Sequence, residues 1–141
     1  MPIKYNTGYK YQLVEDYQFS LVDVDPEHKD VWLKLRILTD YVNIYKGVMT
    51  IYHGYAWDGP SGPAIDTHNF MRGSLIHDAL YQLIREKQLP EDVYRIHADE
   101  ILKRVCIEDG MSKIRAWWVY YGVRFGGYLA ASKIKPVYIS P

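Results

Sequence analysis

Hydrophobic and polar positions alternate along the first 57 residues of the chain. The segment VWLKLRIL places Val31, Leu33, Leu35 and Ile37 on one side of an extended chain, and this period of two is typical of a half-buried β-strand. YKYQLV, YQFSLV and GVMTIYHGYAW have the same character, and DVDPEHKD (residues 23–30) indicates a turn before the Val31 strand. We therefore expect an antiparallel sheet of about four strands within residues 1–57.

The period changes after Trp57. Residues 58–66 begin with DGPSGP, which holds two glycines and two prolines in six residues and indicates an irregular loop. From residue 67 onward the apolar positions recur every three or four residues, which is the spacing of one helix face. Thr67 and Asn69 are the candidate N-caps. The stripe of this first helix is formed by Phe70, Gly73, Ile76, Leu80, Leu83 and Ile84.

Two further helices are predicted before residue 135. LPEDVYRIHADEILKRVCIEDG has Pro90 and two acidic residues at its start and Gly110 at its end, which are ordinary helix start and stop signals. Its apolar stripe consists of Tyr94, Ala98, Ile101 and Val105. The third helix follows Ser112, and one of its sides carries Ile114, Trp117, Trp118, Tyr121, Phe125 and Tyr128.

Strands followed by helices, without βαβ alternation, indicate the α+β class. We expect an N-terminal antiparallel sheet and a three-helix C-terminal half, with strands in residues 1–57, the Gly/Pro loop in 58–66 and helices in 67–135. A length of 141 residues is typical of a single domain, so we assign residues 1–141 to one domain.

The charge balance, the cysteine count and the apolar runs of the chain exclude several classes of partner and of fold. The chain has 17 Lys and Arg against 17 Asp and Glu, whereas duplex-binding modules usually carry a basic excess, so nucleic acid is not the expected partner. The single Cys106 excludes an intramolecular disulfide framework. The apolar run Ala116–Ala131 is too short for a membrane span and contains Arg124. MPIKYNTGYK lacks the pattern of a signal peptide, so a cytoplasmic location is expected.

Three positions concentrate the chemistry of the chain. His77 and Asp78 are adjacent on the first helix and point about 100° apart, while Asp99 on the next, antiparallel helix is expected to face them. An imidazole nitrogen with two carboxylates is a ligand set for a divalent metal that activates water. His77, Asp78 and Asp99 are therefore candidate metal ligands, with His68 or His97 as a further ligand.

The same residues also fit a purely structural role. His77 would then donate a hydrogen bond to Asp58 or Asp99, and Asp58 would accept from the backbone of the Gly/Pro loop. A nucleophilic role for Ser61 has less support, because Pro63 occupies the last position of a Gly-x-Ser-x-Gly elbow. The site and scaffold interpretations both remain open at this stage.

The third helix carries more aromatic residues than one core face can hold. AWWVYYGVRFGGY has aromatics at consecutive positions, for example Trp117 and Trp118, and Tyr and Trp are enriched at interfaces as well as in cores. Self-association or a protein partner through this helix is therefore a second expectation.

These motifs resemble the domain-of-unknown-function 1353 family, small proteins common in phages and prophages. Gly54, Tyr55, Asp58, Ser61 and Pro63 match its first motif; His77, Asp78, Leu80 and Tyr81 match its second; Ala98 and Asp99 match its third. The chain departs from the family pattern at Trp57 and Ala79. The resemblance implies a phage origin, in the host cytoplasm or the virion, and a polar set of Asp58, Ser61, His77, Asp78 and Asp99. It implies no particular activity.

The leading functional hypothesis is a small hydrolase with a metal site. His77, Asp78 and Asp99 would be ligands or acid–base groups, and Asp58 and Ser61 would orient a substrate or water. The alternative is a virion or assembly protein that acts by binding.

Overall fold

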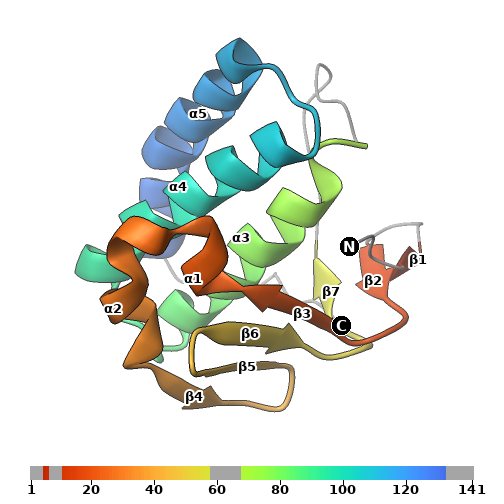
Figure 1. Ribbon diagram of the computed structural model, residues 1–141, viewed down its shortest axis with the longest axis vertical. Coiled ribbons are helices and arrows are strands. Elements are labelled where there is room, and N and C mark those ends of the chain that lie inside the picture. Colours follow the sequence, from red (N-terminus) through yellow and green to blue (C-terminus); the bar gives the residue numbers. More distant parts are fainter. Residues whose placement is uncertain (1–4, 7–10, 58–67, 133–141) are drawn as a thin grey trace. The chain divides into compact units, whose positions relative to one another are not determined.

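The strands precede the long helices along the chain, which confirms the α+β class and the helical C-terminal half (Figure 1). This computed structural model describes residues 5–6, 11–57 and 68–132. The elements follow in the order β1 (Tyr5–Asn6), β2 (Tyr11–Leu13), β3 (Tyr17–Ser20), α1 (Leu21–Val24), the 3-10 helix η1 (Pro26–His28), α2 (Lys29–Leu33), β4 (Arg36–Leu38), β5 (Val42–Tyr45), β6 (Val48–Ile51), β7 (Ala56–Trp57), α3 (Met71–Arg85), α4 (Glu91–Glu108) and α5 (Lys113–Ser132).

Contacts divide the described chain into two compact units, one formed by the residues up to Trp57 and one by residues 68–132. All seven described strands lie in the first unit, and α3, α4 and α5 form the second. The division concerns the packing within each unit, and the assignment of residues 1–141 to a single domain stays a prediction.

The strands of the first unit form the predicted antiparallel sheet of four strands and, in addition, a separate antiparallel sheet of three strands. One sheet has the order β1-β2-β7 and the other β3-β6-β5-β4. In the second sheet Ile44 pairs with Met49 and Val42 with Ile51, and all four side chains are fully buried. The polar residues between them face the other way, so the alternation seen in the sequence corresponds to one buried face.

The β5–β6 hairpin turns through Lys46 and Gly47, which both have positive φ angles of 53° and 77°. A two-residue loop with this geometry matches the twist of the flanking strands. A Cβ at Gly47 would lie 2.7 Å from Val22 Cγ1, and the Gly47 carbonyl accepts a hydrogen bond from the Leu21 amide at 2.8 Å. Glycine is therefore required both for the turn and for its close approach to α1.

The segment between Leu21 and Leu33 is helical, so the predicted turn at residues 23–30 and the first half of the Val31–Leu38 strand are wrong. The alternating pattern predicted that Leu33 would face the core, but Trp32 is the buried residue and Leu33 is exposed. Trp32 donates its indole N–H to the buried carboxylate of Asp25 at 3.0 Å. The strand begins only at Arg36.

The three long helices occur as predicted, and the predicted stripes of α3 and α4 are buried, whereas Ile114, Trp117, Trp118, Tyr121 and Phe125 of the third predicted stripe are exposed on α5. Phe70, Ile76, Leu80, Leu83 and Ile84 of the first stripe are buried, as is the whole stripe of α4. α3 begins at Met71 after Phe70, which makes no side-chain cap, so the prediction of Thr67 or Asn69 as N-cap is wrong. Gly110 follows the end of α4 with a φ of 104°, as expected for a helix stop.

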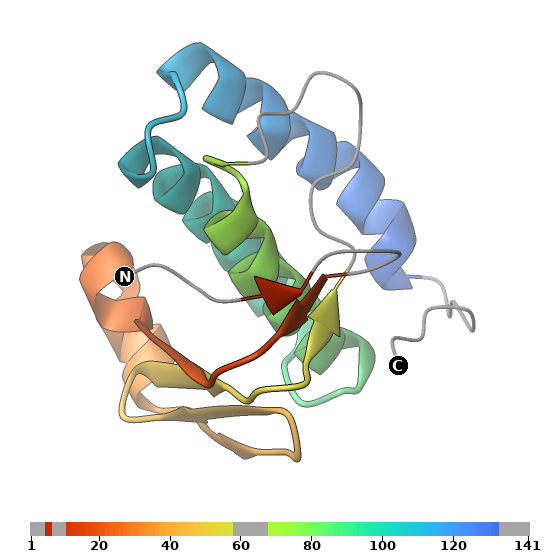
Figure 2. The ribbon, with the colours of Figure 1, turned by 90° about the vertical axis from the view of Figure 1, so that its right-hand side faces the viewer.

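α4 packs against both α3 and α5 (Figure 2). Arg72 at the start of α3 forms a bidentate pair with Asp109 just after α4, through Nε to Oδ2 at 3.0 Å and Nη2 to Oδ1 at 2.9 Å. This pair joins the first turn of α3 to the last turn of α4, so the two helices run antiparallel. Among the described residues, none of the helices is long and apolar enough to cross a bilayer.

Candidate functional site

The buried carboxylate of Asp99, on α4, is the centre of a polar cluster within the second unit. Its side chain is fully buried, yet it carries partners on both oxygens. Oδ1 accepts hydrogen bonds from His77 Nε2 at 2.8 Å and from the Tyr81 hydroxyl at 2.6 Å. Oδ2 accepts from Arg124 Nη1 at 2.8 Å. A buried charge requires such compensation.

Helical spacing brings these side chains together. His77 and Tyr81 are four residues apart on α3, so they share one face, and their ring centroids lie 4.2 Å apart. Arg95 and Asp99 have the same spacing on α4, and Arg95 Nη1 lies 3.8 Å from Asp99 Oδ2. Arg124 comes from α5. All three helices of the second unit therefore contribute to the cluster.

Arg95 supports the cluster from the side of α5. Its Nη1 donates to the backbone carbonyl of Arg124 at 3.2 Å, and its Nε lies 3.8 Å from Glu91 Oε2. The Arg95 side chain is almost buried, whereas that of Arg124 is partly exposed. The Arg124 ion pair is therefore the one that solvent reaches.

His77 lies between two carboxylates. Its Nε2 faces Asp99, and its Nδ1 lies 3.8 Å from Asp78 Oδ1. Burial by itself would lower the pKa of the imidazole, but the neighbouring Asp78 and Asp99 carboxylates outweigh it and raise the pKa of His77 above its ordinary value. Asp78 is 35% exposed at its side chain, so it connects the buried imidazole to solvent.

Burial and the Asp99 carboxylate raise the pKa of Tyr81 far above its ordinary value. Its hydroxyl therefore keeps its proton at every physiological pH and acts only as a donor to Asp99. The Tyr81 bond helps orient the Asp99 carboxylate, whose Oδ1 also accepts from His77.

The cluster contains some of the predicted site residues and not others. His77, Asp78 and Asp99 lie together, as the antiparallel helices predicted, and the bond from His77 to Asp99 is the one that the structural interpretation expected. Asp58 and Ser61 lie outside the described residues. His68 is exposed and precedes α3 by three residues, and His97 packs edge-on against Tyr94 with centroids 6.4 Å apart.

The geometry bears on the metal interpretation. Asp78 and Asp99 face opposite nitrogens of the His77 ring, so the two carboxylates lie on opposite sides of the imidazole. A cation at Nδ1 would have His77 and Asp78 as ligands, with Asp99 orienting the ring from the far side, as outer carboxylates do for many metal-bound histidines. The three-ligand set His77, Asp78 and Asp99 stays a prediction, and the arrangement favours a proton on Nδ1.

Sequence reasoning did not assign Tyr81, Arg95 or Arg124 to the site. The spacing in the sequence could have indicated two of them: Tyr81 lies four residues after His77, and Arg95 lies four residues before Asp99. Arg124 is the only charged residue in the most apolar stretch, Ala116–Ala131, which is itself an indication that it pairs with a buried acid.

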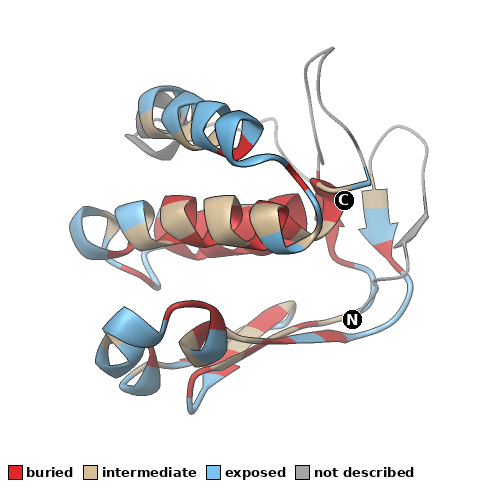
Figure 3. Ribbon diagram, turned by 45° about the horizontal axis from the view of Figure 1, so that its top comes forward, coloured by how far each residue is buried: buried red, intermediate tan, exposed pale blue. Residues whose placement is uncertain are grey.

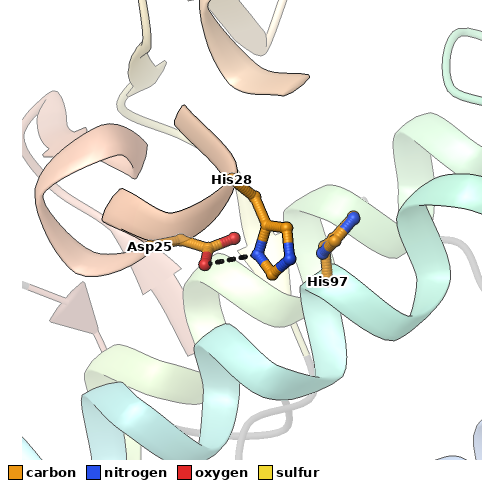
Figure 4. A group of neighbouring side chains, drawn as sticks. All are labelled: Asp25, His28 and His97. Atoms are coloured by element: carbon orange, nitrogen blue, oxygen red, sulfur yellow. Dashed lines mark hydrogen bonds and ion pairs between the residues drawn. The ribbon is translucent and has the colours of Figure 1, made fainter. Parts of the chain in front are cut away.

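A second buried carboxylate lies in the first unit. Asp25 accepts the indole N–H of Trp32 and a hydrogen bond from His28 Nδ1 at 2.9 Å (Figure 4). His97, also labelled there, belongs to α4 of the second unit. Because Asp25 joins α1 to α2 through Trp32, its role within the first unit is to hold the helical segment that replaces the predicted strand.

The model of the family described as "Protein of unknown function (DUF1353)" matches residues 35–123, which is more than half of the chain. The chain belongs to the DUF1353 family. The match confirms the resemblance inferred from the motifs, and it includes His77, Asp78, Tyr81 and Asp99 of the cluster. No curated protein and no solved structure matches the chain. The DUF1353 assignment names no reaction, so function is argued from the site.

Proposed function

We propose that the protein is a small hydrolase in which His77 transfers protons between substrate and solvent. The hydrogen bond from His77 Nε2 to the buried Asp99 carboxylate, at 2.8 Å, is the observation that carries this proposal. A carboxylate at one imidazole nitrogen fixes the ring and its tautomer and leaves the other nitrogen for proton transfer.

The neighbouring groups fit this role. Asp78, whose side chain is 35% exposed beside Nδ1, relays protons to solvent, and hydrogen bonds from Tyr81 and Arg124 hold the Asp99 carboxylate in place. Although burial lowers the pKa of His77, the Asp78 and Asp99 carboxylates raise it above its ordinary value, which favours a role for the imidazole as a general acid. Asp58 and Ser61 remain the proposed substrate- or water-orienting residues.

The proposal includes a bacteriophage origin, with the protein acting in the host cytoplasm or the virion, as the family resemblance implies. Metal dependence is a separate question. Elemental analysis of tag-free protein beside Asp78→Ala answers it, because a metal held at Nδ1 would be lost with the Asp78 carboxylate.

The test uses p-nitrophenyl acetate, p-nitrophenyl phosphate and bis-p-nitrophenyl phosphate as probes. We expect hydrolysis of at least one probe, a loss on the order of a hundredfold in His77→Gln, and wild-type rates in the matched control His53→Gln. His53 is an exposed histidine that pairs with Asp16. Asp78→Asn, which leaves the buried bonds intact, should shift the pH profile. Absence of turnover with all three probes, or an equally active His77→Gln, overturns the proposal.

The second candidate function is a virion or assembly protein that acts by binding. The exposed aromatic residues of α5 favour it, because they provide contact surface that the fold does not use. Its test is mass spectrometry of purified virions, in which the chain should be present at stoichiometric amount.

A further inference from the structure

Five apolar side chains form an exposed row along α5, beginning at Ile114. The other four lie three, four, seven and eleven residues after Ile114, so all five share one helix face. Their exposed fractions are 73% for Ile114, 43% for Trp117, 73% for Trp118, 59% for Tyr121 and 79% for Phe125. Figure 3 shows α5 largely pale blue, in contrast to the buried surfaces of α3 and α4. We call these five residues the aromatic row.

The aromatic row is not needed to hold α5 in place. The opposite face of the helix supplies Ala116, which is fully buried, and Val119 and Val123, which pack against a cluster of Phe70, Leu102, Cys106, Met111 and Ala116. The helix is therefore anchored on one face, and the row lies on the other face as surface.

Cations border the aromatic row, and carboxylates are absent from α5. The helix contains Lys113, Arg115 and Arg124 and no Asp or Glu. At about 100° per residue, Lys113 lies along one edge of the row and Arg115 along the other, whereas Arg124 is paired with Asp99. Lys103 of α4 adds a third positive group at the row, with its ammonium 3.6 Å from the centroid of the Trp117 ring.

We infer that the aromatic row binds the surface of an anionic lipid bilayer, with α5 lying in the plane of the headgroups. Helices that bind in this way combine Trp and Phe on one face with Lys and Arg at its borders. Trp and Tyr favour the interfacial region, and the flanking cations are attracted to anionic headgroups. A second copy packed row to row would instead add three cations and no carboxylate from its own α5.

This inference does not depend on the proposed proton transfer by His77. Lipid binding concerns exposed side chains of α5, and every experiment below reads binding and not turnover. Failure of the hydrolase assay therefore leaves the membrane test intact, and the reverse also holds.

Tryptophan fluorescence is a direct probe of the row. Of the four tryptophans, Trp32 and Trp57 are buried, whereas Trp117 and Trp118 belong to the row. With vesicles of phosphatidylcholine and phosphatidylglycerol in equal amounts, we expect a blue shift of the emission and co-sedimentation of the protein. Both effects should be absent with phosphatidylcholine alone and weaker when salt is raised from roughly 0.1 M to 0.5 M.

Variants separate the two components of binding. Trp118→Ser/Phe125→Ser removes exposed apolar surface, and Lys113→Gln/Arg115→Gln removes charge; each should weaken partitioning at least on the order of tenfold. The matched control is Leu38→Ser, which removes an apolar side chain that is 64% exposed on β4 of the first unit. It should bind like the wild type, and circular dichroism should show all four proteins folded.

Three results would overturn the inference. The first is the absence of binding to the anionic vesicles. The second is equal binding to neutral vesicles, or binding that the Trp118→Ser/Phe125→Ser variant leaves unchanged. The third is a dimer in sedimentation velocity that this variant abolishes without any vesicle binding, which would assign the row to a second copy of the chain.

Discussion

At the scale of single residues, the buried Asp99 carboxylate both stabilises the packing of the helices and orients His77 of the candidate site. A fully buried carboxylate is costly unless it is paired, and here His77, Tyr81 and Arg124 all donate to it. The lone Cys106 shows a different outcome of burial, because it has no compensating ion pair and the charge of Arg72 only partly opposes the effect of burial. Burial, with a smaller contribution from Asp109, raises the pKa of Cys106 to about 12, which is typical of an inert thiol.

Replacement of Asp99 by asparagine should destabilise the protein strongly. Removing one partner of a buried ion pair leaves the others without compensation, and the lower end of the usual range, about 3 kcal/mol in the free energy of unfolding, applies because Arg124 is partly exposed. Urea denaturation measures this change. The control Asp92→Asn removes an exposed carboxylate from the same helix and should cost less than about 1 kcal/mol. Equal effects of the two substitutions would contradict the pairing described for Asp99.

The titration of His77 should make stability depend on pH. Because the folded state raises the pKa of His77 above its unfolded value, the stabilisation from protonated His77 is fully present below about pH 6.5. It is lost as the pH rises through the higher, folded-state pKa. The difference in free energy of unfolding between the wild type and His77→Gln should therefore decrease as the pH rises above about 6.5. A difference that stays constant or grows would mean that the folded-state pKa is not raised.

At the scale of elements, α3 and α4 approach closely where α3 has a glycine. A Cβ at Gly73 would lie 3.0 Å from Leu102 Cδ1 and 3.1 Å from Cys106 Sγ. Both neighbours are buried, so neither moves into solvent to make room. By contrast, nothing lies within 4 Å of the corresponding position at Gly122 on α5.

The two glycines should therefore respond differently to alanine. Gly122→Ala should stabilise the protein by about 0.5–1 kcal/mol, because alanine costs less backbone entropy in a helix. Gly73→Ala has the same gain but crowds the buried contact, where overpacking costs about 1–3 kcal/mol. We expect Gly73→Ala to be less stable than Gly122→Ala by at least about 1 kcal/mol in thermal or urea denaturation. Equal stability would mean that the helices separate without cost.

At the scale of the whole molecule, the charge balance is neutral while its distribution is uneven. The sequence isoelectric point is about 7.0, yet α5 carries three cations and no acidic residue. A chain without net charge has little long-range repulsion to oppose contact between exposed apolar surfaces.

Self-association should consequently be strongest near neutral pH. The second virial coefficient from static light scattering should be lowest near pH 7 and rise toward pH 5.5 and pH 8.5 as net charge develops. The variant Trp118→Ser/Phe125→Ser should make the minimum shallower, because it removes exposed apolar surface and leaves the charge unchanged. A coefficient independent of pH would show that net charge does not govern contacts between copies.

Local patterns in the sequence were enough to predict the α+β class, the three long helices and the buried stripes of α3 and α4. They were also enough to place His77 opposite Asp99. These features depend on residues close together in the chain: helical spacing defines the buried face of α3 and of α4, and the short connection between the helices makes them antiparallel. Such information is local, so it is present in the sequence itself.

Only the tertiary structure decided the features that depend on distant partners. The helical segment Lys29–Leu33 buries Trp32, which reaches the buried Asp25, against the alternation predicted for Val31 and Leu33. Arg124 joined Asp99 from a helix 25 positions further along the chain. The aromatic row became surface because the opposite face of α5 packs against the core. In each case the free energy of burying or pairing a side chain outweighs the weaker local preference of the segment that carries it.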